Sequence, residues 1–169
     1  MKRTRKQREP WPLDSLVVRA DELADEGKNR EAVQLLWKAA RAGNLSAQLN
    51  LGFHLATGRG VRRSRDKALY WYKRAAGGGH AAAAANVGFI YRDERRSRLA
   101  LRWFEKAIAL GDEDAMLEVA KLCLGVLADT KKAKRLLSRV LASKKVTLAT
   151  QEEAVRLKRE FLQGDYQAD

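Results

Sequence analysis

The segment 47–80 holds two short amphipathic stretches separated by a glycine-containing loop at 57–61. Apolar and small residues recur at helical spacing on both sides of this loop. They are Leu51, Gly52 and Leu55 before it, and Ala68, Trp71, Tyr72 and Ala75 after it. The two loop glycines permit positive φ and a reversal of the chain. Because one helix pair of this size cannot bury its apolar faces alone, we expect similar pairs before and after it.

Glycines recur where the second helix of each expected pair ends, at Gly43, Gly79 and Gly111, with spacings of 36 and 32 residues. Small residues keep the same register inside the helices. They are Ala47, Ala83 and Ala115, then Gly52, Gly88 and Ala120, in the first helices; and Ala32, Ala68 and Ala100, then Ala39, Ala75 and Ala107, in the second helices. Small residues at fixed positions let two helix backbones approach closely. The sequence therefore predicts an all-α array of stacked antiparallel helix pairs.

The central pair carries a longer motif. It consists of Leu51-Gly52, Gly58-Arg59-Gly60-Val61, Lys67-Ala68, Trp71-Tyr72, Lys73-Arg74-Ala75-Ala76 and Gly79. This motif resembles the Sel-like repeat, a relative of the tetratricopeptide repeat. The following copy keeps Val87-Gly88, Trp103-Phe104 and Gly111 but lacks the Gly-x-Gly-Val loop. The resemblance covers about 14–143 and implies a right-handed α-solenoid that acts as an adaptor.

The expected organisation is a single helical repeat domain over 13–163. Its repeats span about 14–43, 44–79, 80–111 and 112–145, followed by a capping helix at 150–163. Asp14 and Asn44 are predicted N-caps, and Thr150 with Glu153 is a predicted capping box. Residues 1–12 form a basic N-terminal arm and residues 164–169 a tail expected to fray. Within the arm, Trp11 is expected to cover the open end of the first helix pair or, alternatively, to anchor a partner.

The charge of the chain favours acidic partners. It has 34 Lys and Arg against 21 Asp and Glu, a net charge of +13. Nucleic acid, an acidic protein and an anionic surface all fit this balance. The single cysteine, Cys123, allows no disulfide within the chain. No segment approaches the roughly 18 apolar residues of a membrane span. We expect a cytoplasmic protein with no membrane insertion.

The residues that catalysis needs are sparse. The two histidines, His54 and His80, and one cysteine offer no zinc-ligand spacing. The run 77–80 follows no predicted strand and has no Gly-Lys-Ser/Thr after it, so we interpret it as the end of a helix. Carboxylates at 21–26 are typical of a solvated helix face. The sequence therefore predicts no enzyme, no cofactor and no metal site.

In tetratricopeptide-like arrays the first helices of the pairs line a concave groove, and transferring that layout gives a candidate partner-binding groove. Its predicted residues are Leu49, Asn50, Phe53, Thr57, Ala85, Asn86, Phe89, Arg92, Leu117, Glu118 and Lys121. Asn50 matches Asn86, and Phe53 matches Phe89. An Asn amide can pair with a ligand backbone and a Phe ring supplies apolar area. Alternatively, the two Asn side chains bond between adjacent helices.

Basic residues gather at the turns of successive repeats. The predicted basic ridge consists of Arg59, Arg62, Arg63, Arg65, Arg95, Arg96, Arg98, Lys131, Lys132, Lys134 and Arg135. Two functions follow as hypotheses. The first is an adaptor for an acidic protein partner, such as a toxin neutralised by an immunity protein or a secretion component. The alternative is a nucleic-acid-associated protein that uses the ridge and the arm. An oligomeric scaffold is a third, weaker hypothesis.

Overall fold

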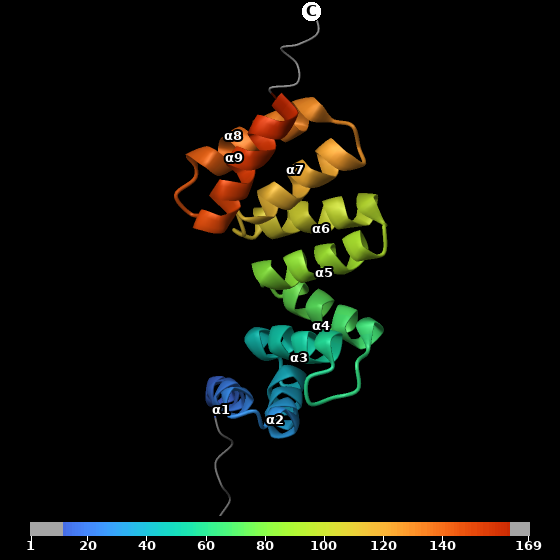
Figure 1. Cartoon of the computed structure of the whole chain (residues 1–169). Helices are drawn as coiled ribbons and strands as arrows, with labels where there is room; N and C mark the ends of the chain where they lie inside the picture. Colours follow the sequence, from blue (N-terminus) through green and yellow to red (C-terminus); the bar gives the residue numbers. More distant parts are fainter. Residues whose placement is uncertain (1–11, 163–169) are drawn as a thin grey trace, which may run out of the picture. The chain divides into compact units, whose positions relative to one another are not determined.

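The computed structural model describes residues 12–162, and side chains up to residue 161. The predicted arm, including Trp11, and the predicted tail lie outside these residues, apart from Pro12. The described residues form nine helices and no strand (Figure 1). The helices are α1 (Leu13–Asp25), α2 (Asn29–Arg41), α3 (Leu45–Thr57), α4 (Arg65–Gly77), α5 (Ala81–Asp93), α6 (Ser97–Ala109), α7 (Ala115–Gly125), α8 (Thr130–Ala142) and α9 (Leu148–Leu162). The predicted all-α fold class is confirmed.

The chain divides into two compact units, which are described separately below. The N-terminal unit, 1–78, contains α1 to α4, and the C-terminal unit, 79–169, contains α5 to α9. Inside each unit, consecutive helices pack against one another. That the repeats form one continuous domain stays a prediction.

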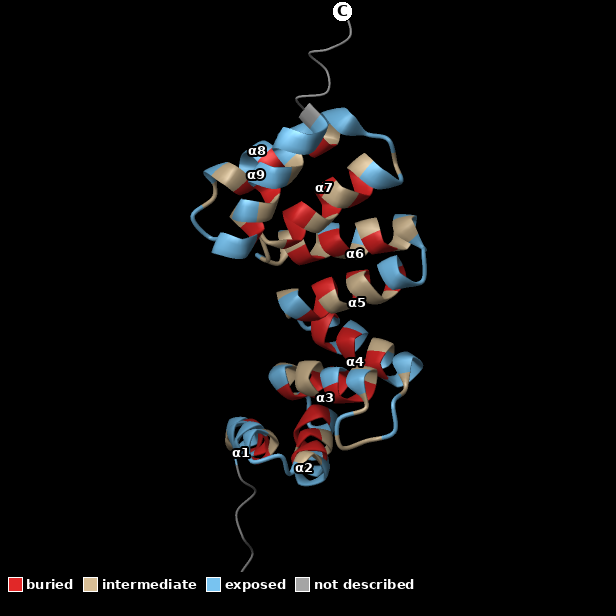
Figure 2. Ribbon diagram, in the orientation of Figure 1, coloured by how far each residue is buried: buried red, intermediate tan, exposed pale blue. Residues whose placement is uncertain are grey.

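Close helix contacts in both units depend on the predicted small residues. In the N-terminal unit, a Cβ added at Gly52 on α3 would lie 2.5 Å from Cε1 of Tyr72 on α4. In the C-terminal unit, a Cβ added at Gly88 on α5 would lie 2.7 Å from Cδ1 of Phe104 on α6. A glycine therefore admits an aromatic ring against the backbone of the first helix in each pair. These helix sides are buried in Figure 2.

The glycines that were aligned from the sequence share one backbone conformation. Gly43, Gly79 and Gly111 have φ of +99°, +100° and +102°. Each follows the end of a second helix, at the left-handed position that commonly terminates helices. This regularity confirms the predicted repeat register.

Helix starts agree with the sequence at Asn44 and differ from it at Asp14. The Asn44 side chain accepts a hydrogen bond from the Ala47 N–H at 2.8 Å, which confirms the predicted N-cap of α3. Asp14 lies within the first turn of α1 and caps nothing there, so that prediction is wrong. Its Oδ1 instead accepts a hydrogen bond from Asn44 Nδ2 at 2.7 Å. This bond joins α1 to the start of α3.

The C-terminal helix exists as predicted, but it begins earlier, at Leu148. The capping-box prediction is wrong, because Thr150 lies inside the first turn and is 9% exposed. Thr147 Oγ1 accepts the Thr150 N–H at 3.3 Å and has the capping role. α9 packs on α8 and α7, and Ala154 is fully buried there. Across the described part of the chain, no helix has the length and apolar composition to cross a bilayer.

Candidate partner-binding surfaces

Phe53 is the one aromatic residue among the predicted groove residues of the N-terminal unit. It lies on α3 and is 43% exposed. The Arg59 guanidinium carbon lies 5.3 Å from the centre of its ring. The Thr57 hydroxyl donates a hydrogen bond to the Phe53 carbonyl oxygen at 2.8 Å. This hydroxyl is therefore bonded within α3. Leu49 is half-buried on the same helix. The surface therefore presents an aromatic ring with a cation over it.

Asn50 connects two helices. Its Nδ2 donates a hydrogen bond to Oδ1 of Asp21 on α1 at 3.0 Å. The structure thus shows the alternative interpretation for this side chain, a bond between neighbouring helices. Partial burial raises the pKa of Asp21, and the bond from Asn50 opposes that rise. Asn86, at the matching position on α5, is half-buried.

The C-terminal unit brings four predicted groove residues together around a cavity of about 310 Å³. They are Ala85, Phe89, Leu117 and Glu118. Leu117 is only 3% exposed, so it forms the wall of the cavity and offers little surface to a partner. The remaining lining residues, absent from the prediction, are Asp112, Asp114, Ala115, Ala149, Thr150 and Glu153. Thr150 and Glu153 belong to α9, and no local sequence signal places that helix against α7.

The charged groove residues of this unit pair with one another. The Glu118 carboxylate forms ion pairs with the Arg92 guanidinium at 2.7 Å and with Lys121 Nζ at 2.8 Å. Lys121 also lies 2.9 Å from Glu153. Burial by itself lowers the pKa of Lys121, but its bonds to the two glutamates outweigh burial and raise the pKa above its usual value. These three groove side chains, Arg92, Glu118 and Lys121, therefore stabilise the C-terminal unit itself.

Asp114 fixes the start of α9 to the start of α7. Its Oδ1 accepts the Thr147 N–H at 2.9 Å and the Thr147 hydroxyl at 3.1 Å. Burial alone raises the pKa of Asp114, but the bonds from Thr150 and Thr147 outweigh it and leave the pKa below its usual value. The ionised carboxylate therefore holds α9 in place.

Asp114→Ala is expected to lower the free energy of unfolding by about 1–2 kcal/mol, because the Thr147 N–H loses its acceptor. Hydrogen exchange should accelerate most in α9. Because the folded-state pKa is lowered, the contribution of the ionised group is complete above the unfolded-state pKa of about 3.9 and is lost as pH falls through the folded-state pKa. Asp114→Asn, which keeps an acceptor oxygen, is the control, and its free energy of unfolding should fall by less. Unchanged exchange in α9 of the alanine variant would contradict the anchoring role.

The basic turn of the N-terminal unit lies between α3 and α4. Arg59, Arg62, Arg63 and Arg65 are all exposed. Gly60 in this turn sits against the backbone of Asn29 at the start of α2, which fixes the loop on the neighbouring pair. Arg62 and Arg30 line a hollow of about 310 Å³ beside it. This unit therefore carries a compact patch of arginines.

In the C-terminal unit, the basic turn between α5 and α6 lies next to the turn between α7 and α8. Arg95, Arg96 and Arg98 share the lining of a hollow of about 470 Å³ with Val126 and Leu127. Val126 is 66% exposed, an apolar surface that the sequence reasoning missed. The predicted ridge of successive basic turns, within this unit and beyond it, stays a prediction.

Basic residues on α8 differ in exposure. Lys131, Lys134 and Arg135 are exposed. Lys132 is half-buried, and its Nζ lies 2.7 Å from Glu105 on α6. Its predicted place among the partner-facing cations is therefore weakened, because its charge is already used to join two helices.

Four stretches of the chain match the model of the Sel1 repeat, at residues 26–44, 45–80, 81–112 and 114–139. This chain belongs to the Sel1 repeat family. The second and third stretches coincide with the pairs α3–α4 and α5–α6, the first covers α2, and the fourth covers α7 and most of α8. The resemblance expected from the central motif is confirmed. No curated protein matches this Sel1 repeat chain in sequence.

Three solved structures that share the fold are longer than this chain. A Sel1 repeat protein from Oxalobacter formigenes is 25% identical with a TM-score of 0.66, over 77% of this chain and 55% of its own. A protective antigen of uropathogenic Escherichia coli with the SLR fold is 24% identical with a TM-score of 0.74, over 90% of this chain and 34% of its own. An immunity protein from Pseudomonas aeruginosa is 23% identical with a TM-score of 0.54, over 78% of this chain and 54% of its own. The Sel1 chain thus spans about a third to a half of these proteins, and they establish its solenoid fold class.

Proposed function

We propose that this Sel1 repeat protein is a non-enzymatic adaptor that captures one protein partner with an acidic surface. The observation that carries the proposal is a repeated aromatic–arginine pair. Arg59 lies over the Phe53 ring in the N-terminal unit, and Arg92 lies 4.9 Å from the centre of the Phe89 ring in the C-terminal unit. Aromatic and arginine side chains are enriched among the residues that dominate binding energy at protein interfaces. Phe53 and Phe89, at matching positions on the first helices of their pairs, are therefore the candidate anchors, while Arg92 also pairs with Glu118.

Charge supports an acidic partner. The chain carries a net charge of +13, and the turn arginines of the N-terminal unit are exposed. A positive surface accelerates association with a negative one and disfavours basic partners. We extend the proposal to a narrower role, in which the partner is a toxin that this protein neutralises or a component of a secretion system that it binds. One protein with this fold is an immunity protein, and that likeness concerns the fold.

The aromatic–arginine pairs can be tested by partner capture. The tagged protein is used to recover partners from lysate at low and moderate salt, with and without nuclease. Phe53→Ala combined with Phe89→Ala is expected to reduce recovery of a stoichiometric protein at least tenfold, because both rings lose their apolar contact area. Tyr70→Ala is a matched control, since Tyr70 is 54% exposed and lies beside Arg74 on the same helix, α4, which is the second helix of its pair. Recovery that survives the double substitution while Tyr70→Ala abolishes it would contradict the proposal.

Nucleic-acid association is the alternative, and the exposed cations of α8 favour it. It predicts recovery that is broad, nuclease-sensitive and steeply reduced by salt. Reversal of Lys131, Lys134 and Arg135 to Glu should then abolish binding to RNA or DNA at moderate salt. Nuclease-resistant capture of a single protein would reject this alternative.

A further inference from the structure

The C-terminal unit has a hollow of about 470 Å³ between the α5–α6 turn and the α7–α8 turn, which we call the turn hollow. Figure 1 shows the two turns on the same side of this unit. Val126 is 66% exposed there, and Leu99 and Leu127 are half-buried. The full lining consists of Arg95, Arg96, Ser97, Arg98, Leu99, Val126 and Leu127. The turn hollow thus places apolar surface directly beside three arginines.

The arginines of the turn hollow have few carboxylates near them. Arg95 and Arg98 are exposed, and neither forms an ion pair with another residue of 12–161. Arg96 lies over the Tyr91 ring at 5.0 Å and pairs with Glu94 at 3.7 Å. A guanidinium binds a carboxylate through two parallel N–H groups, and the described residues supply no such carboxylate to Arg95 or Arg98. Charge complementarity therefore favours an acidic occupant.

Arg95 holds a backbone conformation that favours glycine. Its φ is +57°, and Gly27, at the matching position two residues before α2, has φ of +78°. The hydrogen bonds agree with this register, since the N–H groups of Arg95 and Gly27 donate to the carbonyl oxygens of Arg92 and Ala24. Strain at a residue with a Cβ is concentrated at functional positions. The strain therefore singles out the Arg95 side chain within the turn hollow.

The N-terminal unit shows what kind of segment fits over such a helix start. The loop after α3 covers the start of α2, where Gly60 sits against the backbone of Asn29. Val61, the next residue of this loop, is half-buried and lines the space beside Arg30. A short non-helical segment with one apolar side chain therefore fills this place in the N-terminal unit.

The matching place in the C-terminal unit lacks such a cover. Counted from the starts of the 13-residue helices α2 and α6, Arg98 matches Arg30. The loop after α3 spans 58–64, whereas the loop after α7 spans only 126–129. The shorter loop leaves the turn hollow open to a segment from another chain.

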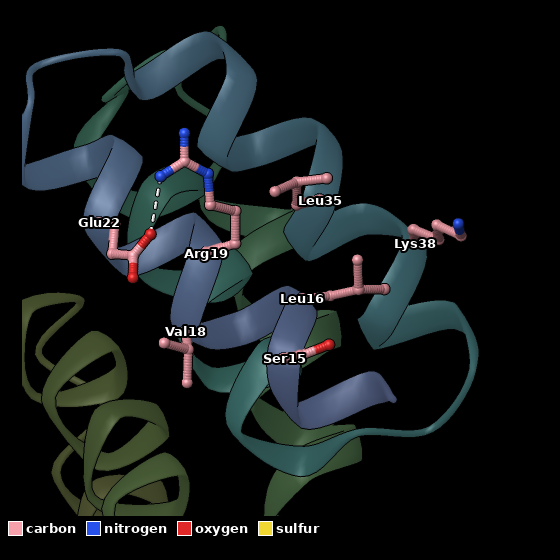
Figure 3. A pocket seen from close by; sticks show the side chains of 7 residues that line it. All are labelled: Ser15, Leu16, Val18, Arg19, Glu22, Leu35 and Lys38. Carbon is pink, nitrogen blue, oxygen red and sulfur yellow. Dashed lines mark hydrogen bonds and ion pairs between the residues drawn. The ribbon is translucent and has the colours of Figure 1, made fainter. Parts of the chain in front are cut away.

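The groove between α1 and α2 does not point to one occupant in this way. It has a volume of about 610 Å³, and Leu16 and Leu35 line it from neighbouring helices (Figure 3). Its rim combines Lys38 with the Arg19–Glu22 ion pair at 2.7 Å. These opposed charges select neither an acidic nor a basic partner.

We propose that the turn hollow docks a short non-helical segment of the protein partner, in which one large apolar side chain stands between two acidic residues. The apolar side chain packs on Val126 and Leu127, and the carboxylates pair with Arg95 and Arg98. This acid–apolar–acid core corresponds to the three residues by which the loop after α7 is shorter than the loop after α3. The inference rests on the adaptor function and adds a contact separate from the aromatic–arginine pairs.

Two other occupants fit the turn hollow less well. A nucleic-acid backbone would pair its phosphates with the arginines but leave Val126 and Leu127 uncovered, because phosphate contacts need no apolar surface. A second copy that docked through the same hollow would bring two sets of exposed arginines together, and like charges oppose such a contact. An acidic segment with an apolar side chain matches both halves of the lining.

The test uses a designed probe and the full chain. The probe is a fluorescein-labelled ten-residue linear peptide with one central Leu between two Glu and with Gly and Ser elsewhere, and fluorescence anisotropy measures its binding. A peptide with Ser in place of Leu has the same charge and should bind at least fivefold more weakly, because it loses the apolar contact. A peptide with Lys in place of Glu should bind at least tenfold more weakly. A diazirine analogue of the central Leu should crosslink to residues 95–99 or 126–127.

Protein variants separate the turn hollow from general attraction to a basic chain. Arg95→Gly with Arg98→Ala should weaken probe binding at least fivefold. The thermal unfolding midpoint of this variant should stay close to that of the wild type, because glycine accepts the positive φ at position 95. Arg135→Ala with Arg139→Ala removes the same charge from exposed positions on α8 and should change binding less than twofold.

The apolar half of the turn hollow has its own variant. Val126→Ser should weaken probe binding at least threefold, whereas Val155→Ser on α9 should not, although Val155 is also an exposed valine at 45%. Phe53→Ala with Phe89→Ala should leave probe binding unchanged. Failure of the adaptor proposal and failure of this inference are therefore distinguishable.

Several results would overturn the inference. One is equal binding of the Leu and Ser peptides, and another is an equal loss in the two arginine double variants, because either would leave only general charge attraction. Tighter probe binding after removal of 163–169, which carry two Asp, would assign the hollow to the chain's own C-terminal segment. A dimer in sedimentation that Val126→Ser dissolves would assign it to a second copy. A single-stranded oligonucleotide that displaces the probe and whose binding needs Arg95 and Arg98 would assign it to nucleic acid.

Discussion

Phe104→Ala is expected to lower the free energy of unfolding of the C-terminal unit by about 3–5 kcal/mol. Phe104 is fully buried between α5 and α6. Its ring lies against the backbone at Gly88 and 5.1 Å from the centre of the Phe89 ring. Truncation leaves a cavity that the surrounding helices can fill only in part. Urea denaturation monitored by circular dichroism measures the loss.

Gly88 makes this prediction specific to the helix contact. Alone, Gly88→Ala is expected to cost about 1–3 kcal/mol, because the new Cβ collides with the Phe104 ring. In the Phe104→Ala background the ring is gone, and alanine should then be neutral or stabilise α5 by up to about 1 kcal/mol through its helix propensity. The two substitutions should therefore be strongly non-additive. Additive losses would show that the ring does not occupy the space over Gly88.

Gly60→Ala has the largest expected effect in the N-terminal unit, about 2–4 kcal/mol. Gly60 has φ of +69°, a conformation that strains any residue with a Cβ. An added Cβ would also overlap the carbonyl group of Asn29 at the start of α2. Backbone atoms of a helix start cannot move aside as a flexible side chain can. The loop should detach from α2, and thermal unfolding together with hydrogen exchange at 58–64 would detect it.

Gly43→Ala is the matched control in the same unit. Gly43 has φ of +99°, but a Cβ there would meet nothing within 4 Å. Gly43→Ala should therefore lower the free energy of unfolding only through backbone strain, by about 1–2 kcal/mol. The difference between the two variants isolates the contact between the loop and α2. Equal losses would mean that the loop does not depend on that contact.

Helix pairing was predictable because its signals are local. The small residues and the helix-ending glycines repeat within windows shorter than 40 residues, and they predicted close helix contacts at Gly52 and Gly88. They did not predict that the rings of Tyr72 and Phe104 fill these contacts. Helix starts were less certain, because several Thr and Asp residues can cap. At the last helix Thr147, three residues before the predicted Thr150, has that role.

The candidate surfaces were predictable only in part. The exposed Phe53 and the turn arginines follow from register on an amphipathic helix. The hydrogen-bond partner of Asn50 does not follow from register, because a bond to a protein partner and a bond to Asp21 use the same side-chain amide. The sequence placed Lys132 and Lys121 on partner-binding surfaces. In the structure, Lys132 pairs with Glu105 on α6 and Lys121 pairs with Glu153 on α9. Such pairs join residues 27 or more positions apart, and no spacing rule reaches that far.

By itself, the sequence determined that this chain is an array of helix pairs, where each pair turns, and which small residues lie at close helix contacts. Those features depend on backbone conformation and on 3.6-residue periodicity, which act over a few turns. Tertiary packing alone decided which charges are left for a partner and where a groove opens. Both depend on which helix covers which face. Glu118 pairs with Arg92 on α5 and with Lys121, Glu153 on α9 pairs with Lys121, and no described helix covers the groove between α1 and α2.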